Sequence, residues 1–222
     1  MDIHIIGTPH AIYVIVFMTK KKLNKEGLNM SEQTATNLTQ DLVVNGVNVT
    51  QLIDTVGLIK ENADIADFKF RATNKWINGG HNRSEINEYH GALQEMSRDE
   101  AFVMDNDEPP VLLGQDNGAN PVEYVLHALA GCMTTTMVYK AALLGIKLEE
   151  VESELEGDLD LRGFLEMSDD VRNGYKNIRV NFKVKAEGAP ERLKQLEKLC
   201  MGSPVFDIVT NPVPVTITVN EK

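Results

Sequence analysis

The segment NPVEYVLHALAGCM, residues 120–133, begins with a helix-start pattern and continues as an apolar run that contains a cysteine. Asn120 is a favoured N-cap residue, Pro121 suits the first helical position, and Glu123 completes a capping box. Cys132 is therefore expected on a long helix. Its surroundings decide whether this thiol only packs in a core or performs chemistry.

The helix is predicted to continue to Leu144, because Gly145 is a natural C-terminal stop. Between the two ends only Glu123 and Lys140 carry a formal charge. A helix that is apolar on all sides is typically central and packed on both sides. We therefore expect a long buried helix at the centre of the fold.

The composition excludes several classes of function. The chain has 222 residues, with 42% hydrophobic and 25% charged, which is ordinary for one large globular domain or two small ones. Its 22 basic and 33 acidic side chains give a net charge of −11, which would repel phosphate backbones and anionic membrane surfaces. No stretch reaches the roughly 20 apolar residues of a spanning helix. Neither nucleic acid nor a membrane is expected as a partner.

The apolar stretch AIYVIVFM, residues 11–18, is not arranged as an export signal. Its lysines follow it, at 20–22, and no small-residue cleavage pattern comes after it. It is expected to be a strand or a disordered leader. The polar sequence that opens at Met30 is a plausible alternative start, which would leave residues 1–29 outside the functional fold. We therefore expect a cytoplasmic protein.

The chain contains two cysteines, Cys132 and Cys200. In the cytoplasm both are expected to be reduced or to cycle, rather than to form a permanent disulfide. There is no CxxC pair and no His/Cys cluster at zinc spacing, and the five histidines are scattered. The sequence therefore predicts no metal and no cofactor.

The remaining pattern is mixed. Strands are expected at 66–77, 83–91, 101–105, 110–114, 151–163, 178–186 and 213–219. Shorter helices are expected at 47–62, 190–200 and 203–209. The Gly-Gly pair in NGGHN, residues 78–82, predicts a β-hairpin. These elements predict an α+β fold, with residues 66–222 as one domain. A leader and short helix, partly disordered, precede it at 1–65.

From residue 67 to 219 this order of elements resembles the OsmC/Ohr family of osmotically inducible and organic hydroperoxide resistance proteins. The likeness is carried by NPVEYVLHALAGC (120–132), by the strand pair that follows, and by SPVFDIVTN (203–211). The resemblance implies antiparallel sheets around a long buried helix, in an intertwined homodimer with two active sites at the subunit interface. It also implies a thiol peroxidase that reduces organic hydroperoxides and is recycled by a dithiol reductant.

In that family a peroxidatic cysteine lies on the long helix, and Cys132 matches its position. A thiol on an apolar helix face has a raised pKa, so its reaction needs a nearby cation. The resemblance implies an arginine on the Gly-rich turn of the hairpin. In WINGGHNRSEI the nearest match is Arg83, and His81 occupies part of the same turn. Arg71, in the preceding strand, is a weaker candidate.

Two positions depart from the family pattern. The acid that directly follows proline is replaced by Val122, and Glu123, one residue later, points about 100° away around the helix. The resolving cysteine before Pro-Val is replaced by Ser203, while Cys200 lies three residues earlier. Three outcomes stay open: Cys200 has taken over as the resolving thiol, the enzyme uses one cysteine, or peroxidase activity has been lost.

Two functions therefore compete. The first is a hydroperoxide reductase active in oxidative stress, with Cys132 as the nucleophile, Arg83 as its cation, and Cys200 or an outside thiol resolving. The second is a non-catalytic dimer of the same fold that binds a small apolar ligand in its interface pocket.

Overall fold

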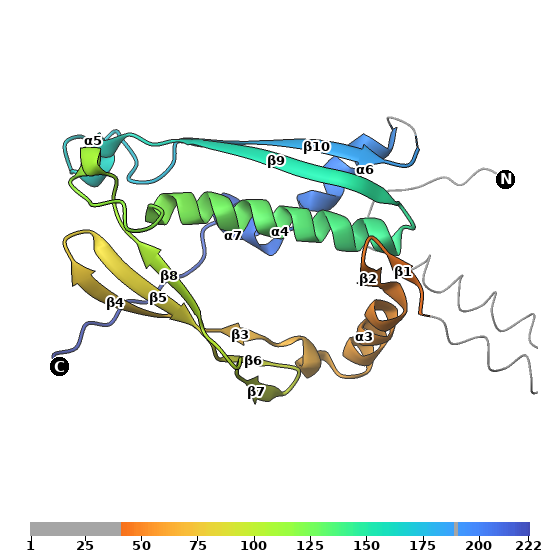
Figure 1. Cartoon of the computed structure of the whole chain (residues 1–222). Coiled ribbons are helices and arrows are strands. Elements are labelled where there is room, and N and C mark those ends of the chain that lie inside the picture. Colours follow the sequence, from red (N-terminus) through yellow and green to blue (C-terminus); the bar gives the residue numbers. More distant parts are fainter. Residues whose placement is uncertain (1–40, 189–190) are drawn as a thin grey trace, which may run out of the picture.

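The computed structural model describes residues 41–188 and 191–222, so the expectations for residues 1–29 fall outside the described residues. Helix α4 runs through the middle of the molecule, with a long strand pair on one side and small antiparallel sheets on the other (Figure 1). Among the described residues no helix combines the length and apolar character needed to cross a bilayer. The fold is α+β with antiparallel sheets, as predicted.

Helix α4, Pro121–Leu143, begins and ends where its caps predict. The side-chain oxygen of Asn120 accepts a hydrogen bond from the Val122 amide, and the Glu123 carboxylate accepts one from the Asn120 amide, both at 2.9 Å. Gly145 follows the helix with φ +66°, a left-handed conformation that a residue without Cβ adopts at little cost.

The long strand pair covers one side of α4. It consists of β9, Leu148–Asp158, and β10, Asn177–Ala186, paired antiparallel. Alternate residues such as Leu155, Val180 and Phe182 pack against the buried core. The predicted strand 151–163 was too long, because the Asp160 side chain caps a short helix, α5 (Leu161–Phe164), and diverts the chain.

The main core lies between α4, the strand pair and helix α6. Helix α6 spans Glu191–Cys200, and helix α7, Pro204–Thr210, starts at the predicted cap Ser203. The buried residues of this core are Leu129, Met133, Met137, Ala141, Ile146, Leu196 and Cys200. On other sides of α4, Val125 is 39% and Tyr139 is 48% exposed. Within one chain, therefore, the helix is packed along one side and open on part of its surface.

The N-terminal described segment covers the C-terminal end of α4. It contains β1 (Val43–Val44), β2 (Val47–Asn48), α3 (Val49–Glu61) and the 3₁₀ helix η1 (Ala63–Ala66). Helix α3 matches the predicted helix at 47–62, and Val47 and Val49 pack on Ala142. The Asn45 side chain donates to the Ile146 carbonyl and accepts from the Leu148 amide, both at 2.9 Å, which ties this segment to the turn after α4.

Two small sheets lie on the opposite side of α4 from the long pair (Figure 1). One contains β4 (Thr73–Asn78), β5 (His81–Ile86) and β8 (Phe102–Asn106); the other contains β3 (Lys69–Phe70), β6 (Tyr89–Gly91) and β7 (Gln94–Met96). The predicted hairpin is confirmed, with Gly79 at φ +55° in its turn.

Two predicted strands are wrong in this chain. In place of the strand at 110–114 there is a 3₁₀ helix, η2 (Pro110–Leu112), because the Asp107 carboxylate accepts hydrogen bonds from the amides of Gln115 and Asn117 and closes the segment into a loop. Residues 213–219 form no strand, and Val219 is 90% exposed. A strand needs a neighbour for its backbone hydrogen bonds, and the described part of a single chain supplies none here.

Candidate active site around Cys132

The two cysteines differ in their surroundings. Cys132 lies near the middle of α4, is partly exposed, and does not belong to the buried core. Its neighbours one turn away, Ala128 and Thr135, are exposed. A thiol in this position can be reached by a small molecule from outside a single chain.

Cys200 is the last residue of α6 and is only 3% exposed within the core. Its Sγ donates a hydrogen bond to the carbonyl oxygen of Glu197 at 3.0 Å. Burial is the main cause that raises the pKa of the Cys200 thiol. In this conformation Cys200 is therefore a protonated core residue, and no hydrogen bond joins it to Cys132 in the described chain.

Ser203 occupies a structural position at the start of α7. It is 1% exposed, and its hydroxyl accepts a hydrogen bond from the Phe206 amide at 3.2 Å as the cap of α7. Glu123 likewise serves the capping box of α4. Neither side chain is left free for chemistry at Cys132.

Arg83 lies within strand β5, as the strand predicted at 83–91 implies. His81 was expected on the turn, but it is the first residue of the same strand. The Arg83 guanidinium donates to the two carboxylate oxygens of Asp105 at 2.9 and 3.0 Å. His81 Nε2 lies 2.8 Å from the same carboxylate. Hydrogen bonds from Arg83 and then from His81 hold the pKa of Asp105 below its usual value. The structure thus brings Arg83 and His81 to a shared carboxylate.

Asp105 is a residue of this cluster that the sequence did not predict. The only signal for it was its place at the end of the apolar run AFVMD, which predicted a strand but not a partner. The pairing arises because β5 and β8 are neighbours in the sheet, with Arg83 directly opposite Asp105. Strand register, which brings together residues distant in the chain, is a tertiary property.

The weaker candidate, Arg71, lies in a similar cluster beside the second small sheet. Its guanidinium contacts the two carboxylate oxygens of Glu95 at 2.7 and 3.2 Å, and His90 Nδ1 lies 3.1 Å from the same carboxylate. The carboxylate of this cluster is the more exposed of the two: the side chain of Glu95 is 63% exposed, against 28% for Asp105.

The sheet that carries Arg83 is connected to α4 by a hydrogen bond. The hydroxyl of Tyr124, in the first turn of α4, donates to the carbonyl oxygen of Asp105 at 2.9 Å. The ring of His127 packs edge-on against Tyr124, with 6.5 Å between the ring centroids. Asp105 therefore contacts Arg83 through its side chain and the Cys132-bearing helix through its backbone.

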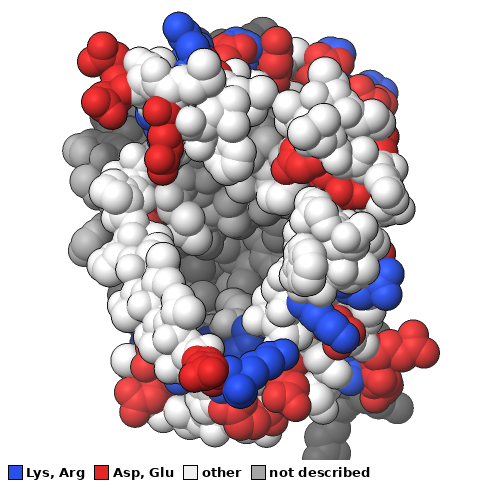
Figure 2. All heavy atoms as spheres, turned by 90° about the vertical axis from the view of Figure 1, so that its left-hand side faces the viewer, with Lys and Arg blue, Asp and Glu red and all other residues white. Residues whose placement is uncertain are grey.

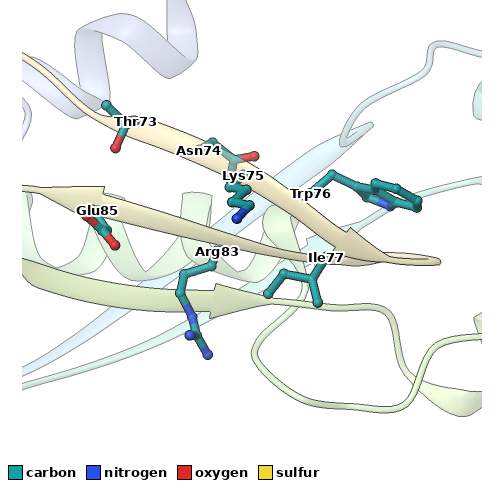
Figure 3. A pocket seen from close by; sticks show the side chains of 7 residues that line it. All are labelled: Thr73, Asn74, Lys75, Trp76, Ile77, Arg83 and Glu85. Atoms are coloured by element: carbon teal, nitrogen blue, oxygen red, sulfur yellow. The ribbon is translucent and has the colours of Figure 1, made fainter.

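The hairpin also lines a hollow of about 590 Å³, and all of its lining residues come from β4 and β5: Thr73, Asn74, Lys75, Trp76, Ile77, Arg83 and Glu85. Figure 3 shows Arg83 and Trp76 extending from the hairpin in different directions. Figure 2, viewed from the side on which α4 begins, shows a face that is hollowed at its centre and has mostly uncharged residues at the rim. Within 41–188 and 191–222, no group of three or more His, Cys, Asp or Glu is arranged to hold a metal ion.

Comparison with known proteins places the chain among similar folds. Residues 114–218 match the family described as OsmC-like protein. The structure resembles an OsmC-like protein from Mycoplasma pneumoniae with 14% identity and a TM-score of 0.50, over 65% of this chain and 89% of that one. None of the curated proteins matches the chain in sequence.

Two further solved structures are similar at lower scores. An OsmC-like protein of unknown function from Vibrio cholerae shares 12% identity at a TM-score of 0.44, over 62% of this chain and 90% of that one. An organic hydroperoxide resistance protein OsmC from Legionella pneumophila shares 17% identity at a TM-score of 0.43, over 64% and 88% of the two chains.

Proposed function

Residues 114–218 of this chain belong to the OsmC-like protein family, and from this premise we propose that the protein is a thiol-dependent peroxidase that reduces organic hydroperoxides. Cys132 is the peroxidatic thiol. The observation that carries the proposal is the contrast between the two cysteines: Cys132 is partly exposed on the family's motif helix, whereas Cys200 is buried in the core. Both thiols are free, which suits a reducing compartment such as the cytoplasm.

The proposed reaction oxidises Cys132 and reduces the hydroperoxide. The Cys132 thiolate attacks the distal peroxide oxygen, so that an S–O bond forms as the O–O bond breaks. The leaving alkoxide takes up a proton and departs as an alcohol, and Cys132 becomes a sulfenic acid. A thiol then displaces water from the sulfenic acid and forms a disulfide. A dithiol reductant restores Cys132 and is itself oxidised to a disulfide.

Arg83 is the proposed cation for the Cys132 thiolate. A guanidinium stays charged at all physiological pH values and stabilises an anion by Coulomb attraction and by hydrogen bonds. Within one described chain the hydrogen bonds of Arg83 go to Asp105, and none reaches Cys132. The site is therefore proposed to be completed in a homodimer, where surfaces that are open in one chain come together.

Two features support a homodimer. Part of the surface of α4 is uncovered, as the exposure of Val125 and Tyr139 shows. In the C-terminal segment, Val215 and Ile217 are 76% and 82% exposed, although their spacing is that of a half-buried strand. A second copy of this chain would offer a sheet edge for that segment and cover these apolar side chains.

The resolving step has two proposed routes. Cys200 can act only if α6 opens, because its Sγ is buried and bonded to the Glu197 carbonyl. A disulfide also requires the two Cα atoms to approach within about 7 Å. The alternative is direct reduction of the sulfenic acid by an external dithiol, with Cys200 as a core residue only.

The test is hydroperoxide consumption by the purified protein with a dithiol reductant. We expect Cys132→Ser to stop the consumption of cumene or tert-butyl hydroperoxide, and consumption by that variant at the parent rate would disprove the proposal. Cys200→Ser separates the two resolving routes. Turnover at the parent rate indicates an external thiol, and accumulation of oxidised Cys132 indicates that Cys200 resolves.

A second candidate is a non-catalytic dimer that binds a small apolar ligand at its interface. It is favoured by the burial of Cys200 and by the use of Ser203 as a helix cap, which leave no exposed second thiol in this chain. Native mass spectrometry that finds a co-purified apolar molecule, together with no hydroperoxide consumption, would support it. A disulfide between Cys132 and Cys200 after one equivalent of hydroperoxide would contradict it.

A further inference from the structure

We propose that Asp105 is the positioning residue for Arg83 and replaces the acid that is missing at Val122. This inference rests on the proposed function, since it assigns the carboxylate that orients the active-site cation. Asp105 and Arg83 lie opposite each other on the paired strands β8 and β5. Their side chains therefore lie on the same face of the sheet, close enough to contact each other directly.

The Asp105 carboxylate fixes the plane of the Arg83 guanidinium. Arg83 Nε donates to Oδ1 and Nη2 donates to Oδ2, at 2.9 and 3.0 Å. A two-point contact of this kind holds a long flexible side chain in one orientation. Of the five N–H donors of a guanidinium, these two bonds use two, so three remain for a thiolate or a peroxide oxygen.

His81 holds the carboxylate from a second direction. Its Nε2 lies 2.8 Å from Asp105 Oδ1, and its side chain is only 19% exposed. The pKa of Asp105 is lowered mainly by the hydrogen bond from Arg83, so the carboxylate is ionised at neutral pH and the pair stays intact. The Arg83 guanidinium is therefore held in one position by the Asp105 carboxylate.

Asp105 also connects this pair to the helix that bears Cys132. Its backbone carbonyl accepts the hydrogen bond of Tyr124 at 2.9 Å. Tyr124 precedes Cys132 by eight residues, or about 12 Å along a helix at 1.5 Å per residue. A single residue thus sets the direction of Arg83 and helps to fix the sheet beside α4.

The chain contains its own control for this assignment. Arg71, Glu95 and His90 form the same kind of cluster, with two Arg–carboxylate contacts and one histidine. Among the described residues, no hydrogen bond connects Glu95 to α4, and its side chain is 63% exposed. If any exposed ion pair could affect the reactivity of Cys132, a substitution in either cluster would change it. We expect the change only on substitution of Asp105.

The experiment compares Asp105→Asn, Asp105→Glu and the control Glu95→Gln in the full-length protein. For Asp105→Asn we expect the rate constant of Cys132 with cumene hydroperoxide to fall roughly 10- to 100-fold, the range typical of a misplaced reacting group. Asp105→Glu restores part of the rate because it keeps the charge, and Glu95→Gln leaves the rate unchanged. Circular dichroism and melting curves confirm that each variant is folded.

A second measurement does not depend on peroxide. The rate of Cys132 alkylation by iodoacetamide is followed against pH in the Cys200→Ser background, and Asp105→Asn is expected to move its midpoint upward, because a freely moving Arg83 stabilises the thiolate less. An unchanged midpoint in Asp105→Asn, or an equal shift in Glu95→Gln, overturns the assignment. If the parent consumes no hydroperoxide while its midpoint still depends on Asp105, the proposed peroxidase function fails and the positioning role stands.

Discussion

The hydroxyl of Tyr175 donates a hydrogen bond to the carbonyl oxygen of Val122 at 2.9 Å. This contact ties the connection between β9 and β10 to the first turn of α4. The ring of Tyr175 crosses Gly157 so closely that a Cβ at that position would lie 2.5 Å from a ring carbon. The first turn of α4 is therefore held by the side chain of Tyr175, and the position of that ring requires glycine at residue 157.

Replacement of Gly157 by alanine should weaken this connection. The new methyl group would push the Tyr175 ring away and lengthen its bond to Val122, and we expect the free energy of unfolding to fall by about 1–3 kcal/mol, as for other overpacked sites. The matched control is Gly57→Ala in α3, where nothing lies within 4 Å of the added Cβ. There we expect a gain of about 0.5–1 kcal/mol from helix propensity. Urea denaturation measures the free energy of unfolding of both variants, and changes of the same sign in the two would contradict the structure.

The Asp107 carboxylate should make the stability of the folded protein depend on pH. Burial opposes its ionisation, but hydrogen bonds from Asn117, Glu108 and Gln115 hold the pKa of its carboxyl below the usual value. Because the folded-state pKa is the lower one, the stabilisation is present above the unfolded-state pKa and is lost as the pH falls through the folded-state value.

We therefore expect Asp107→Asn to melt at a lower temperature than the parent at pH 7, with the difference shrinking as the pH is lowered into the acid range. Asp116→Asn, in the same loop but exposed, is the control and should melt like the parent. Melting temperatures across the pH range check this. A difference that stays constant down to the lowest pH would refute the role of the carboxylate.

The two thiols should differ in reactivity. Cys132 is partly exposed, whereas the Cys200 thiol is buried and its pKa is raised mainly by that burial. In the native protein, iodoacetamide should therefore label Cys132 well before Cys200, and denaturant should equalise the two rates. Peptide mass mapping after timed labelling measures this, and early labelling of Cys200 would show that α6 opens readily.

The C-terminal segment should matter for assembly and little for the isolated chain. Val215 and Ile217 are largely exposed in one copy, and in a β-strand residues two positions apart lie on the same face. If a second copy covers them, the double substitution Val215→Lys and Ile217→Lys should shift the protein from dimer to monomer in light scattering. The control is the double substitution Thr216→Lys and Thr218→Lys, which changes the residues that alternate with Val215 and Ile217. It should retain a larger fraction of dimer than the first variant. Identical behaviour of the two variants would argue against a buried strand.

The sequence alone determined those helices and strands that depend on interactions between residues close together in the chain. Asn120, Pro121 and Glu123 define the start of α4, and Gly145 defines its end, because capping bonds and a left-handed φ involve only neighbouring residues. Alternation of apolar residues likewise predicted β9 and β10. The same local signals failed at 110–114, where a side chain outside the window, Asp107, captures the backbone amides.

Only the tertiary structure decided which groups meet. Arg83 and Asp105 are far apart in sequence and become partners through the register of β5 and β8. The burial of Cys200 and the exposure of Cys132 depend on which side of α4 the strand pair and α6 cover, which an evenly apolar helix does not reveal. Caps and alternation act over a few residues, whereas strand pairing and burial require segments from distant parts of the chain.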